Sequence, residues 1–398
     1  MERRSGTVLV GYEYGLGLGH LARTLPVARA LKARGHEVIY FLYNPSEIAA
    51  VLNEEALPLL PVTGMKAEIP GMTHTPAFNA YSDFMAMAGF YSREQLRVAL
   101  NIWQTIFEYV RPDLIVCDHS PFCCLAAFGR IPVIQLGDGF TLPPVHEAWF
   151  PLIRGQAARV DQEFIFDNMR AVQKHCRRKI PEAITEPFQT AARLLCTLPE
   201  IDHYAIGRRD PVAGPPERDC FFPEPFPEEK RIFAYLKKDY RYLDDIIAAI
   251  CRIALPCDIV INGLPGVRAS WRRNEAVKFY DTPQPVGDLL RKASVVLHHG
   301  GNGLSCAALS MGRMQLVAPA WQESELTAEA LSRIGAGRIL RPGEIADGTA
   351  GGIVDALAGD LKMADRVQSI ARDIQSRGPW NFMKQSIAVC ERILCDCR

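Results

Sequence analysis

Short runs of hydrophobic residues recur along the chain and alternate with longer stretches in which apolar residues return every three or four positions. The short runs predict buried strands, and the longer spacing predicts amphipathic helices. Strands that alternate with helices favour parallel sheets with helices on both faces. The predicted strands are residues 7–11, 37–42, 114–117, 131–137, 231–235, 258–261, 277–280, 295–297 and 315–319.

This alternation stops once, in a proline-rich segment near the middle of the chain. Proline removes backbone donors and interrupts helices and strands, so residues 208–228 are expected to form a linker. A chain of 398 residues is also long for a single hydrophobic core. We therefore expect a first domain over residues 1–207 and a second domain that starts at residue 229.

Composition excludes several classes of protein. The formal net charge is zero, so no overall basic field exists to hold nucleic acid. No apolar run approaches the roughly 20 residues that span a bilayer, and no signal peptide is recognisable. The basic residues of 174–179 leave peripheral membrane contact open, although a solvated helix face explains them more simply. The 12 cysteines lack paired Cys-x-x-Cys spacing, which favours reduced thiols in the cytoplasm.

A glycine-rich loop follows the predicted strand 295–297. The sequence His298-His299-Gly300-Gly301-Asn302-Gly303 precedes a small, apolar helix predicted over residues 304–311. Glycines let the main chain approach a ligand, and a helix N-terminus offers free N–H groups to an anion. The segment therefore predicts a phosphate site, with an ordinary tight turn as the alternative.

The loop after the first strand also contains glycines, but it does not fit a nicotinamide dinucleotide site. That fingerprint requires Gly-x-Gly-x-x-Gly and an acid at the end of the second strand. Gly15 and Gly17 fit, whereas His20 occupies the third glycine position and the second strand ends at Leu42-Tyr43-Asn44. The dinucleotide hypothesis therefore fails at both points.

Two aspartates lie at the carboxyl ends of predicted strands, where open α/β sheets bind ligands. Asp118 follows the strand 114–117, and Asp138 follows the strand 131–137. Either residue is a candidate to orient a histidine, although Asp118 could equally cap the next helix ahead of Pro121. His119, the residue after Asp118, is a candidate for a catalytic base, second to His20.

Together these segments resemble the GT-B glycosyltransferases, in the branch of plant and bacterial enzymes (family 1-like) that use nucleotide sugars. The resemblance implies two doubly wound, Rossmann-like parallel-sheet domains that face each other across a cleft. It also implies an acceptor-binding domain over residues 1–207, a donor-binding domain over 229–377 and a helix over 378–398 that returns to the first domain. The motifs that carry it are Gly19-His20, Pro26, Gly35-His36-Glu37-Val38, His299 to Gly303, Pro319, Glu323 and Thr327-Ala328.

The resemblance implies an inverting glycosyltransferase of the hexosyltransferase type. The donor would be a nucleotide-diphosphate sugar, of the UDP or dTDP type, and the acceptor a hydroxyl of a bulky, partly apolar small molecule or lipid-like compound. No other cofactor is expected, and because the chain has no Asp-x-Asp motif we expect catalysis without a metal.

The resemblance also assigns roles to particular residues. His20 would accept the proton of the acceptor, because histidine can take up a proton near neutral pH, and Asp118 would hold its ring. The diphosphate would bind to His299, Gly300, Gly301, Asn302, Gly303 and Leu304. The donor sugar would contact Glu323 and Ser324, and the acceptor site would be lined by Phe84, Met87, Phe90 and Asp138.

Three residues depart from the family pattern. Leu304 replaces a hydroxyl residue at the phosphate, Ala307 replaces the glutamate that binds ribose, and Ser324 replaces the glutamine of an acidic-Gln pair. These departures leave the donor open and keep two alternatives: a nucleotide-sugar 2-epimerase on the same architecture, and a catalytically silent homologue that binds a partner.

Overall fold

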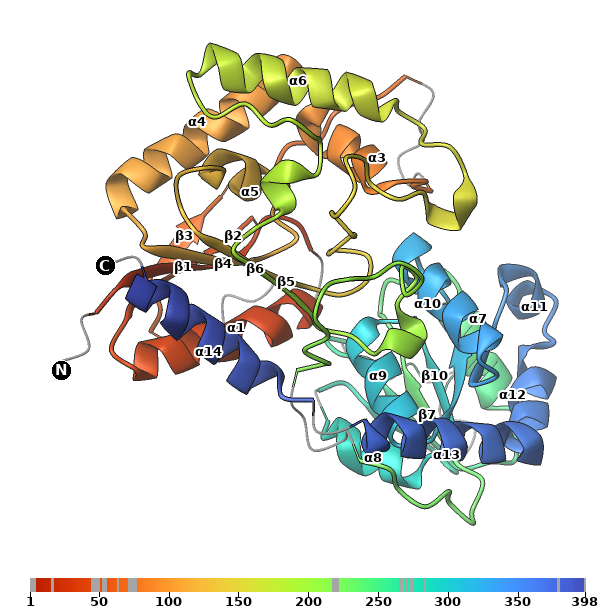
Figure 1. Cartoon of the computed structure of the whole chain (residues 1–398). Helices are drawn as coiled ribbons and strands as arrows, with labels where there is room; N and C mark the ends of the chain where they lie inside the picture. The colour runs from red at the N-terminus through yellow and green to blue at the C-terminus, as the bar shows by residue number, and fades with distance from the viewer. Residues whose placement is uncertain are drawn as a thin grey trace. The chain divides into compact units, whose positions relative to one another are not determined.

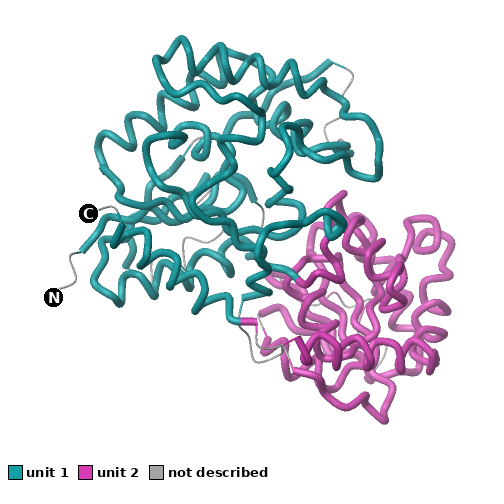
Figure 2. Tube along the Cα trace, in the orientation of Figure 1, with its two compact units in different colours: residues 1–197, 203–216, 381–398 teal, residues 198–202, 217–380 magenta. Residues whose placement is uncertain are grey.

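The computed structural model of the chain describes residues 5–15, 18–43, 51, 56–62, 64–70, 77–216, 222–264, 266, 268, 271, 275–282, 284–377 and 380–396. These residues form two compact units (Figure 2). The first unit draws on residues 1–197, 203–216 and 381–398, and the second on residues 198–202 and 217–380. The segment expected to be a linker is divided between the units after residue 216.

The first unit contains a six-stranded, all-parallel sheet (Figure 1). Its strand order is β3-β2-β1-β4-β5-β6, so consecutive strands are added on one side of β1 and then on the other. The carboxyl ends of β1 and β4 meet at this reversal, the place where doubly wound sheets bind ligands. The strands are β1 (Thr7–Tyr12), β2 (Glu37–Leu42), β3 (Leu59–Pro61), β4 (Leu114–Asp118), β5 (Val133–Gly137) and β6 (Ala192–Leu195).

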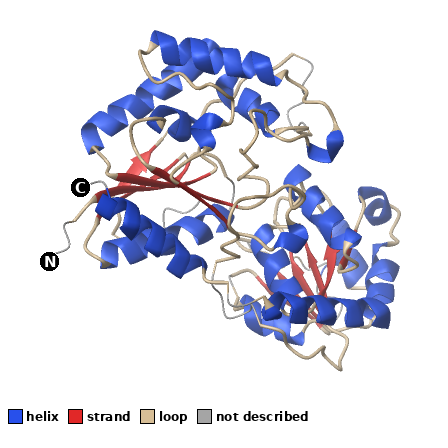
Figure 3. Cartoon of the chain, in the orientation of Figure 1, coloured by secondary structure: helices blue, strands red, loops and turns tan. Residues whose placement is uncertain are grey.

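Helices cover both faces of this sheet (Figure 3) because side chains alternate along each strand. In β1, Val8 and Val10 pack into a cluster with α1 and α14, whereas Leu9 packs into the cluster on the other face. The helices are α1 (Leu18–Ala33), α3 (Tyr81–Met85), the π-helical turn η2 (Ala86–Phe90), α4 (Arg93–Val110), α5 (Pro121–Ala127), α6 (Gln162–His175), α14 (Phe382–Asp396) and the 3-10 turns η3 (Ile153–Gly155) and η4 (Glu186–Phe188).

The second unit repeats this plan around its own parallel sheet. Its strand order is β12-β11-β10-β7-β8-β9, with the reversal between β10 and β7. The strands are β7 (Ile232–Tyr235), β8 (Cys257–Val260), β9 (Val277–Tyr280), β10 (Val295–His298), β11 (Met314–Val317) and β12 (Gly337–Ile339). The predicted fold class, a doubly wound α/β sheet in each half of the chain, is confirmed.

The helices of the second unit enclose a large apolar core on one face of its sheet and a smaller one on the other. In the part of the chain that the structure describes, no helix is long and apolar enough to cross a membrane. The helices are η5 (Pro199–Ile201), α7 (Leu243–Ile250), α8 (Val286–Lys292), α9 (Asn302–Ser310), α10 (Gln322–Arg333), α11 (Pro342–Ala346), α12 (Ala350–Ala358) and α13 (Leu361–Ser376).

Candidate functional site

In the first unit, a histidine and an aspartate meet where β1 and β4 end. Tyr12, the last residue of β1, lies beside Asp118, the last residue of β4. His20 is in the first turn of α1, and its Nδ1 lies 2.8 Å from Oδ2 of Asp118. A β-carbon on Gly15 would lie only 2.1 Å from Cδ2 of His20, so the preceding loop must present a bare α-carbon to the imidazole.

An arginine that sequence reasoning missed joins both candidate aspartates. One turn beyond His20, Arg23 donates from Nε to Oδ2 of Asp118 at 2.7 Å and from Nη1 to Oδ2 of Asp138 at 2.9 Å. All of these side chains are buried. The sequence did contain a signal for Arg23: His20 and Arg23 are three residues apart on α1, and residues three apart lie on the same face of a helix.

Burial and mutual attraction fix the charges of this cluster. Burial opposes ionisation of Asp118, but the charges of Arg23 and His20 outweigh it and lower the pKa of the Asp118 carboxyl below its ordinary value. Burial likewise opposes the charge on Arg23, yet Asp118 and Asp138 raise the pKa of its guanidinium. An ionised Asp118 is an acceptor only, so Nδ1 of His20 carries the proton of their hydrogen bond. Nε2 of His20 then keeps its lone pair for a base reaction.

His119 has surroundings that suit a base less well. Its ring centroid lies 4.2 Å from that of Phe84, and no described residue hydrogen-bonds its buried Nε2. Burial lowers the pKa of His119 to about 3, with the nearby His20 as the next cause. The imidazole therefore remains neutral and accepts a proton poorly near neutral pH, which favours His20 over His119 as the base.

A buried glutamate, also missed from sequence, directly follows β1. Both oxygens of Glu13 accept hydrogen bonds: Oε2 from the Phe122 N–H at 2.9 Å, and Oε1 from the Cys123 N–H at 2.8 Å. Trp103 Nε1 donates to the same carboxyl group. Burial raises the pKa of Glu13 to about 8. Glu13 thus ties the loop after β1 to the start of α5, which follows Asp118.

In the second unit, the glycine loop continues from β10 into α9. Gly300 has φ +79°, and a β-carbon there would lie 2.7 Å from the carbonyl oxygen of Ser324, so only glycine fits. At Gly301, by contrast, a β-carbon would have no described atom within 4 Å. Gly301 is the N-cap of α9, and no side chain caps the helix. A helix that starts in this way, after bare glycines, is the kind of place at which proteins bind anions.

Two neutral histidines hold this loop in place through both ring nitrogens. His299 Nδ1 lies 2.7 Å from the carbonyl oxygen of Ala318, and Nε2 accepts the N–H of Lys237 at 3.1 Å. His298 accepts the N–H of Gly300 at 3.1 Å and contacts Gln315 Oε1 at 3.0 Å. Burial lowers the pKa of each histidine to about 4. In this structure His299 joins the ends of three strands, and a direct contact with phosphate would require release of the Lys237 N–H.

The residues that depart from the family pattern have structural partners. The hydroxyl of Ser324 accepts the N–H groups of Ala320 and Trp321, both at 3.1 Å, and so caps α10 instead of projecting outward. Leu304 is half-buried and packs against the smaller apolar cluster, and Ala307 is buried within it. Glu323 lies half-buried in the first turn of α10.

The chain is similar to known proteins along most of its length. Residues 275–387 match the family model described as "Erythromycin biosynthesis protein CIII-like, C-terminal domain". Over 342 residues the chain is 27% identical to the L-demethylnoviosyl transferase of Streptomyces niveus, covering 81% of this chain and 82% of that protein. Over 380 residues it is 25% identical to the demethyllactenocin mycarosyltransferase of Streptomyces fradiae, covering 90% of this chain and 81% of that protein.

Solved glycosyltransferase structures share the fold of this chain. The calicheamicin glycosyltransferase CalG4 gives a TM-score of 0.71 at 18% identity, covering 98% of this chain and 99% of that chain. The glycosyltransferase VinC, solved in complex with dTDP, gives 0.62 at 18% identity, covering 97% of this chain and all (100%) of that chain. The protein is a glycosyltransferase with the GT-B fold.

The predicted acceptor wall of this glycosyltransferase is only partly accessible. Phe84 packs against His119, and Met87 is half-buried. Phe90 is fully buried and stacks on Phe122 in the core at 4.8 Å between ring centroids, so it cannot line an open surface. Asp138 binds Arg23 and accepts N–H groups of the loop after β5, which makes it a structural anchor.

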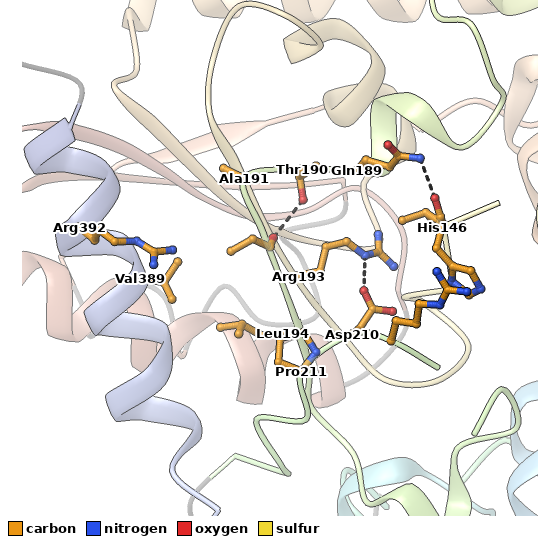
Figure 4. A pocket seen from close by; sticks show the side chains of 13 residues that line it. His146, Gln189, Thr190, Ala191, Arg193, Leu194, Asp210, Pro211, Val389 and Arg392 are labelled. Atoms are coloured by element: carbon orange, nitrogen blue, oxygen red, sulfur yellow. Dashed lines mark hydrogen bonds and ion pairs between the residues drawn. The ribbon is translucent and has the colours of Figure 1, made fainter. Parts of the chain in front are cut away.

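A surface cavity of about 540 Å³ lies at a different place in the first unit, along the edge strand β6 (Figure 4). Arg193 is one of the residues that line the cavity. Its guanidinium already binds protein groups: the side chains of Asp210 and Gln135 and the main-chain carbonyl groups of Phe188 and Pro143. The cavity therefore belongs to the scaffold. Among the described residues, no group of three or more His, Cys, Asp or Glu side chains is placed to hold a metal ion.

Proposed function

We propose that the chain is an inverting, metal-independent glycosyltransferase that moves a sugar from a nucleotide-diphosphate sugar to a hydroxyl of a hydrophobic acceptor. The observation that carries the proposal is the buried His20–Asp118 pair with its 2.8 Å contact. No described residue hydrogen-bonds Nε2 of His20, so this atom is the one that meets the acceptor.

In the proposed reaction, Nε2 of His20 takes the proton of the acceptor hydroxyl while its oxygen attacks the anomeric carbon. The bond from that carbon to the phosphate oxygen breaks on the opposite side, which inverts the configuration. The nucleoside diphosphate leaves with the electron pair, and the first-turn N–H groups of α9 stabilise its charge. Asp118 stabilises the imidazolium that forms.

Two features support a hydrophobic acceptor at the first unit. Aromatic rings surround His119, which lies 6.1 Å from His20 between ring centroids. The similar proteins include the elloramycin glycosyltransferase of Streptomyces olivaceus and a spinosyn rhamnosyltransferase solved with spinosyn aglycone. We infer an aglycone of comparable hydrophobic character, and a cytoplasmic setting in which nucleotide sugars are available.

For the donor we propose a dTDP or UDP sugar bound at the glycine loop of the second unit. The dTDP complex of VinC supports a thymidine nucleotide. A bound sugar would meet Glu323, whereas Ser324 is committed to capping α10. The three relatives from Streptomyces named above are transferases, so the 2-epimerase alternative is not favoured.

The test is incubation of the purified protein with dTDP- and UDP-sugars, with and without a panel of polyphenol and macrolide aglycones. Release of nucleoside diphosphate together with an aglycone glycoside supports the proposal, and NMR of the product should show an anomeric configuration opposite to that of the donor. If the donor is epimerised and no sugar is transferred, the protein is a 2-epimerase and the proposal is wrong. Nucleotide binding without turnover across both panels would support a silent homologue.

A further inference from the structure

A second surface cavity in the first unit, of about 600 Å³, is lined largely by positively charged side chains. Its walls come from α4 and the end of α6, which pack against each other (Figure 1), and from the turn after α5. That turn leads into the amino end of β5, so the cavity lies away from the carboxyl edge at which His20 and Asp118 meet. The cationic residues of the cavity are Arg130, Arg177, Arg178 and Lys179, and no described acidic residue lines it.

The helices that end at the cavity do not need these cations as caps. A helix C-terminus attracts positive charge because its last carbonyl groups lack partners within the helix. At the end of α6, however, the carbonyl oxygen of Gln173 accepts the main-chain N–H of Arg178 at 2.9 Å. At the end of α5, that of Ala127 accepts the main-chain N–H of Arg130, also at 2.9 Å. The guanidinium groups are therefore left for other partners.

Neighbouring side chains offset only part of the charge. Lys179 pairs with Glu186, with 3.3 Å between Nζ and the carboxylate. Arg130 donates to the amide oxygen of Gln104, which is a neutral partner. The amide nitrogen of Gln104 in turn donates to Glu108, which brings one further negative charge to the rim. Two acids thus stand near four cations.

Arg178 is incompletely paired within this group. Its Nη2 donates to the carbonyl oxygen of Leu100 at 2.9 Å, whereas Nη1 is buried and has no hydrogen-bond acceptor among the described residues. Burial lowers the pKa of Arg178, and the charge of the nearby Arg130 acts in the same direction. A buried donor without an acceptor and two neighbouring guanidinium groups are both unfavourable. An anion in the cavity would offset the repulsion between them.

We propose that this cavity binds a phosphate group, held by the guanidinium groups of Arg130, Arg177 and Arg178. The planar fork of a guanidinium pairs with two phosphate oxygens at once, and several forks around one cavity favour a multiply charged phosphate over a single carboxylate. A free phosphate compound and the headgroup of a lipid share this chemistry. The site is separate from the proposed donor and acceptor sites, and it does not rest on the proposed function.

The experiment titrates the full chain with inorganic phosphate and with pyrophosphate by calorimetry at low ionic strength, with dTDP present in excess to fill the donor site. Flotation with phosphatidylcholine vesicles, with and without phosphatidic acid, tests a lipid phosphate. Arg177→Gln and Arg178→Gln each remove one positive charge from the cavity and should weaken binding at least about tenfold. Lys174→Gln is the matched control, because Lys174 is an exposed cation of α6 that does not line this cavity, and it should bind as the unchanged protein does.

The results separate the ligand source from failure of the inference. Binding of phosphate or pyrophosphate that weakens in the arginine variants alone supports a free phosphate compound, and the same pattern with phosphatidic acid vesicles alone supports a lipid headgroup. Binding of none of these by the unchanged protein would overturn the inference. Equal weakening in Lys174→Gln would also overturn it, because the effect would then be one of general charge. Arg177 is exposed, so Arg177→Gln decides the question if Arg178→Gln does not fold.

Discussion

The two sheets present the same edge, the carboxyl ends of the strands at their reversal point, but they equip it with opposite chemistry. At the edge of the first sheet, Arg23, Asp118 and Asp138 form a buried network of full charges around His20. At the edge of the second, His298 and His299 are neutral and bind mainly main-chain groups. One edge is built from side-chain charges, and the other from backbone dipoles.

The difference fits the role proposed for each edge. A group that gains and loses a proton needs fixed charges near it, because they determine which protonation state is stable. A diphosphate is anionic throughout the reaction and gains negative charge as it leaves, so N–H groups that cannot titrate are suited to bind it. Burial lowers the pKa of both loop histidines to about 4, which keeps these two imidazoles neutral near neutral pH.

The largest expected effect separates the two edges by function. His20→Ala should reduce the transfer rate at least about 100-fold, because it removes the general base. It should leave dTDP affinity within about twofold, because the glycine loop belongs to the other unit. Initial rates and calorimetry measure the two quantities. His119→Gln is the control: its parent imidazole is too weak a base, so this variant should retain turnover. A His20→Ala protein that kept most of its rate would show that the base is assigned wrongly.

A second prediction compares two buried arginines, one from each unit. Arg23→Met leaves two buried carboxylates without their cation and should destabilise the fold by about 3 to 5 kcal/mol. Arg313 is also fully buried, but it donates to carbonyl oxygens such as that of Leu290, and burial lowers its pKa to about 10. Arg313→Met should therefore cost less, at most about 2 kcal/mol. Urea unfolding measures the free energy of unfolding of each variant. Equal losses in the two variants would show that the buried carboxylates around Arg23 make no difference.

Sequence patterns predicted the strands because these depend on local order, whereas the pairing of His20 with Asp118 was implied by the family resemblance. Buried strands are visible as apolar runs, and Asp118 is visible because it ends one of them. Arg23 and Glu13 were missed because their partners are remote in sequence: Arg23 reaches Asp138, and Glu13 reaches Phe122. The spacing of His20 and Arg23 on one helix face was the local signal for Arg23, but no local pattern reports the pairing of Arg23 with Asp138 or of Glu13 with Phe122.

The expectation that Phe90 lines the acceptor was wrong for a similar reason. A cluster of aromatic residues gives the same sequence signal in a core as in a binding wall, so Phe90 could not be separated from Phe84. The assignment of Ser324 to the donor sugar, made from its aligned position, stays a prediction; its hydroxyl accepts the N–H groups of the two residues that precede α10. Which side chains are already occupied becomes visible only in three dimensions.

A third prediction tests whether the second edge depends on bare main chain. Gly300→Ala introduces a β-carbon 2.7 Å from a backbone oxygen, at φ +79°, and should destabilise the protein by roughly 1 to 3 kcal/mol. Gly301→Ala meets no described atom within 4 Å and should leave stability unchanged. If a diphosphate lies against Gly301, this second variant should still weaken dTDP binding. Thermal unfolding and calorimetry on the same two proteins separate the effects, and normal dTDP affinity in Gly301→Ala would argue against close approach there.

The smallest predicted effect is a pH dependence of opposite sign at the two edges. Burial raises the pKa of Glu13 from 4.5 to about 8, so between these values the folded protein keeps a proton that the unfolded chain has released. Its contribution to stability is complete below about pH 4.5 and is lost as the pH rises to about 8. His298 behaves in the opposite way, because burial lowers its pKa from 6.5 to about 4. Its contribution is complete above about pH 6.5 and is lost as the pH falls to about 4.

Each group can contribute a slope of at most about 1.4 kcal/mol per pH unit, and backbone amides report the two separately. The N–H groups of Phe122 and Cys123 donate to Glu13, and that of Gly300 donates to His298. After correction for intrinsic exchange rates, hydrogen exchange should show protection at residues 122–123 falling from pH 5 to 8, and protection at residue 300 falling from pH 6.5 to 4. Glu13→Gln should flatten the first trend alone, and His298→Gln the second alone. Parallel trends at the two places would mean that the edges share one titrating group, and the contrast between charged and neutral edges would then be wrong.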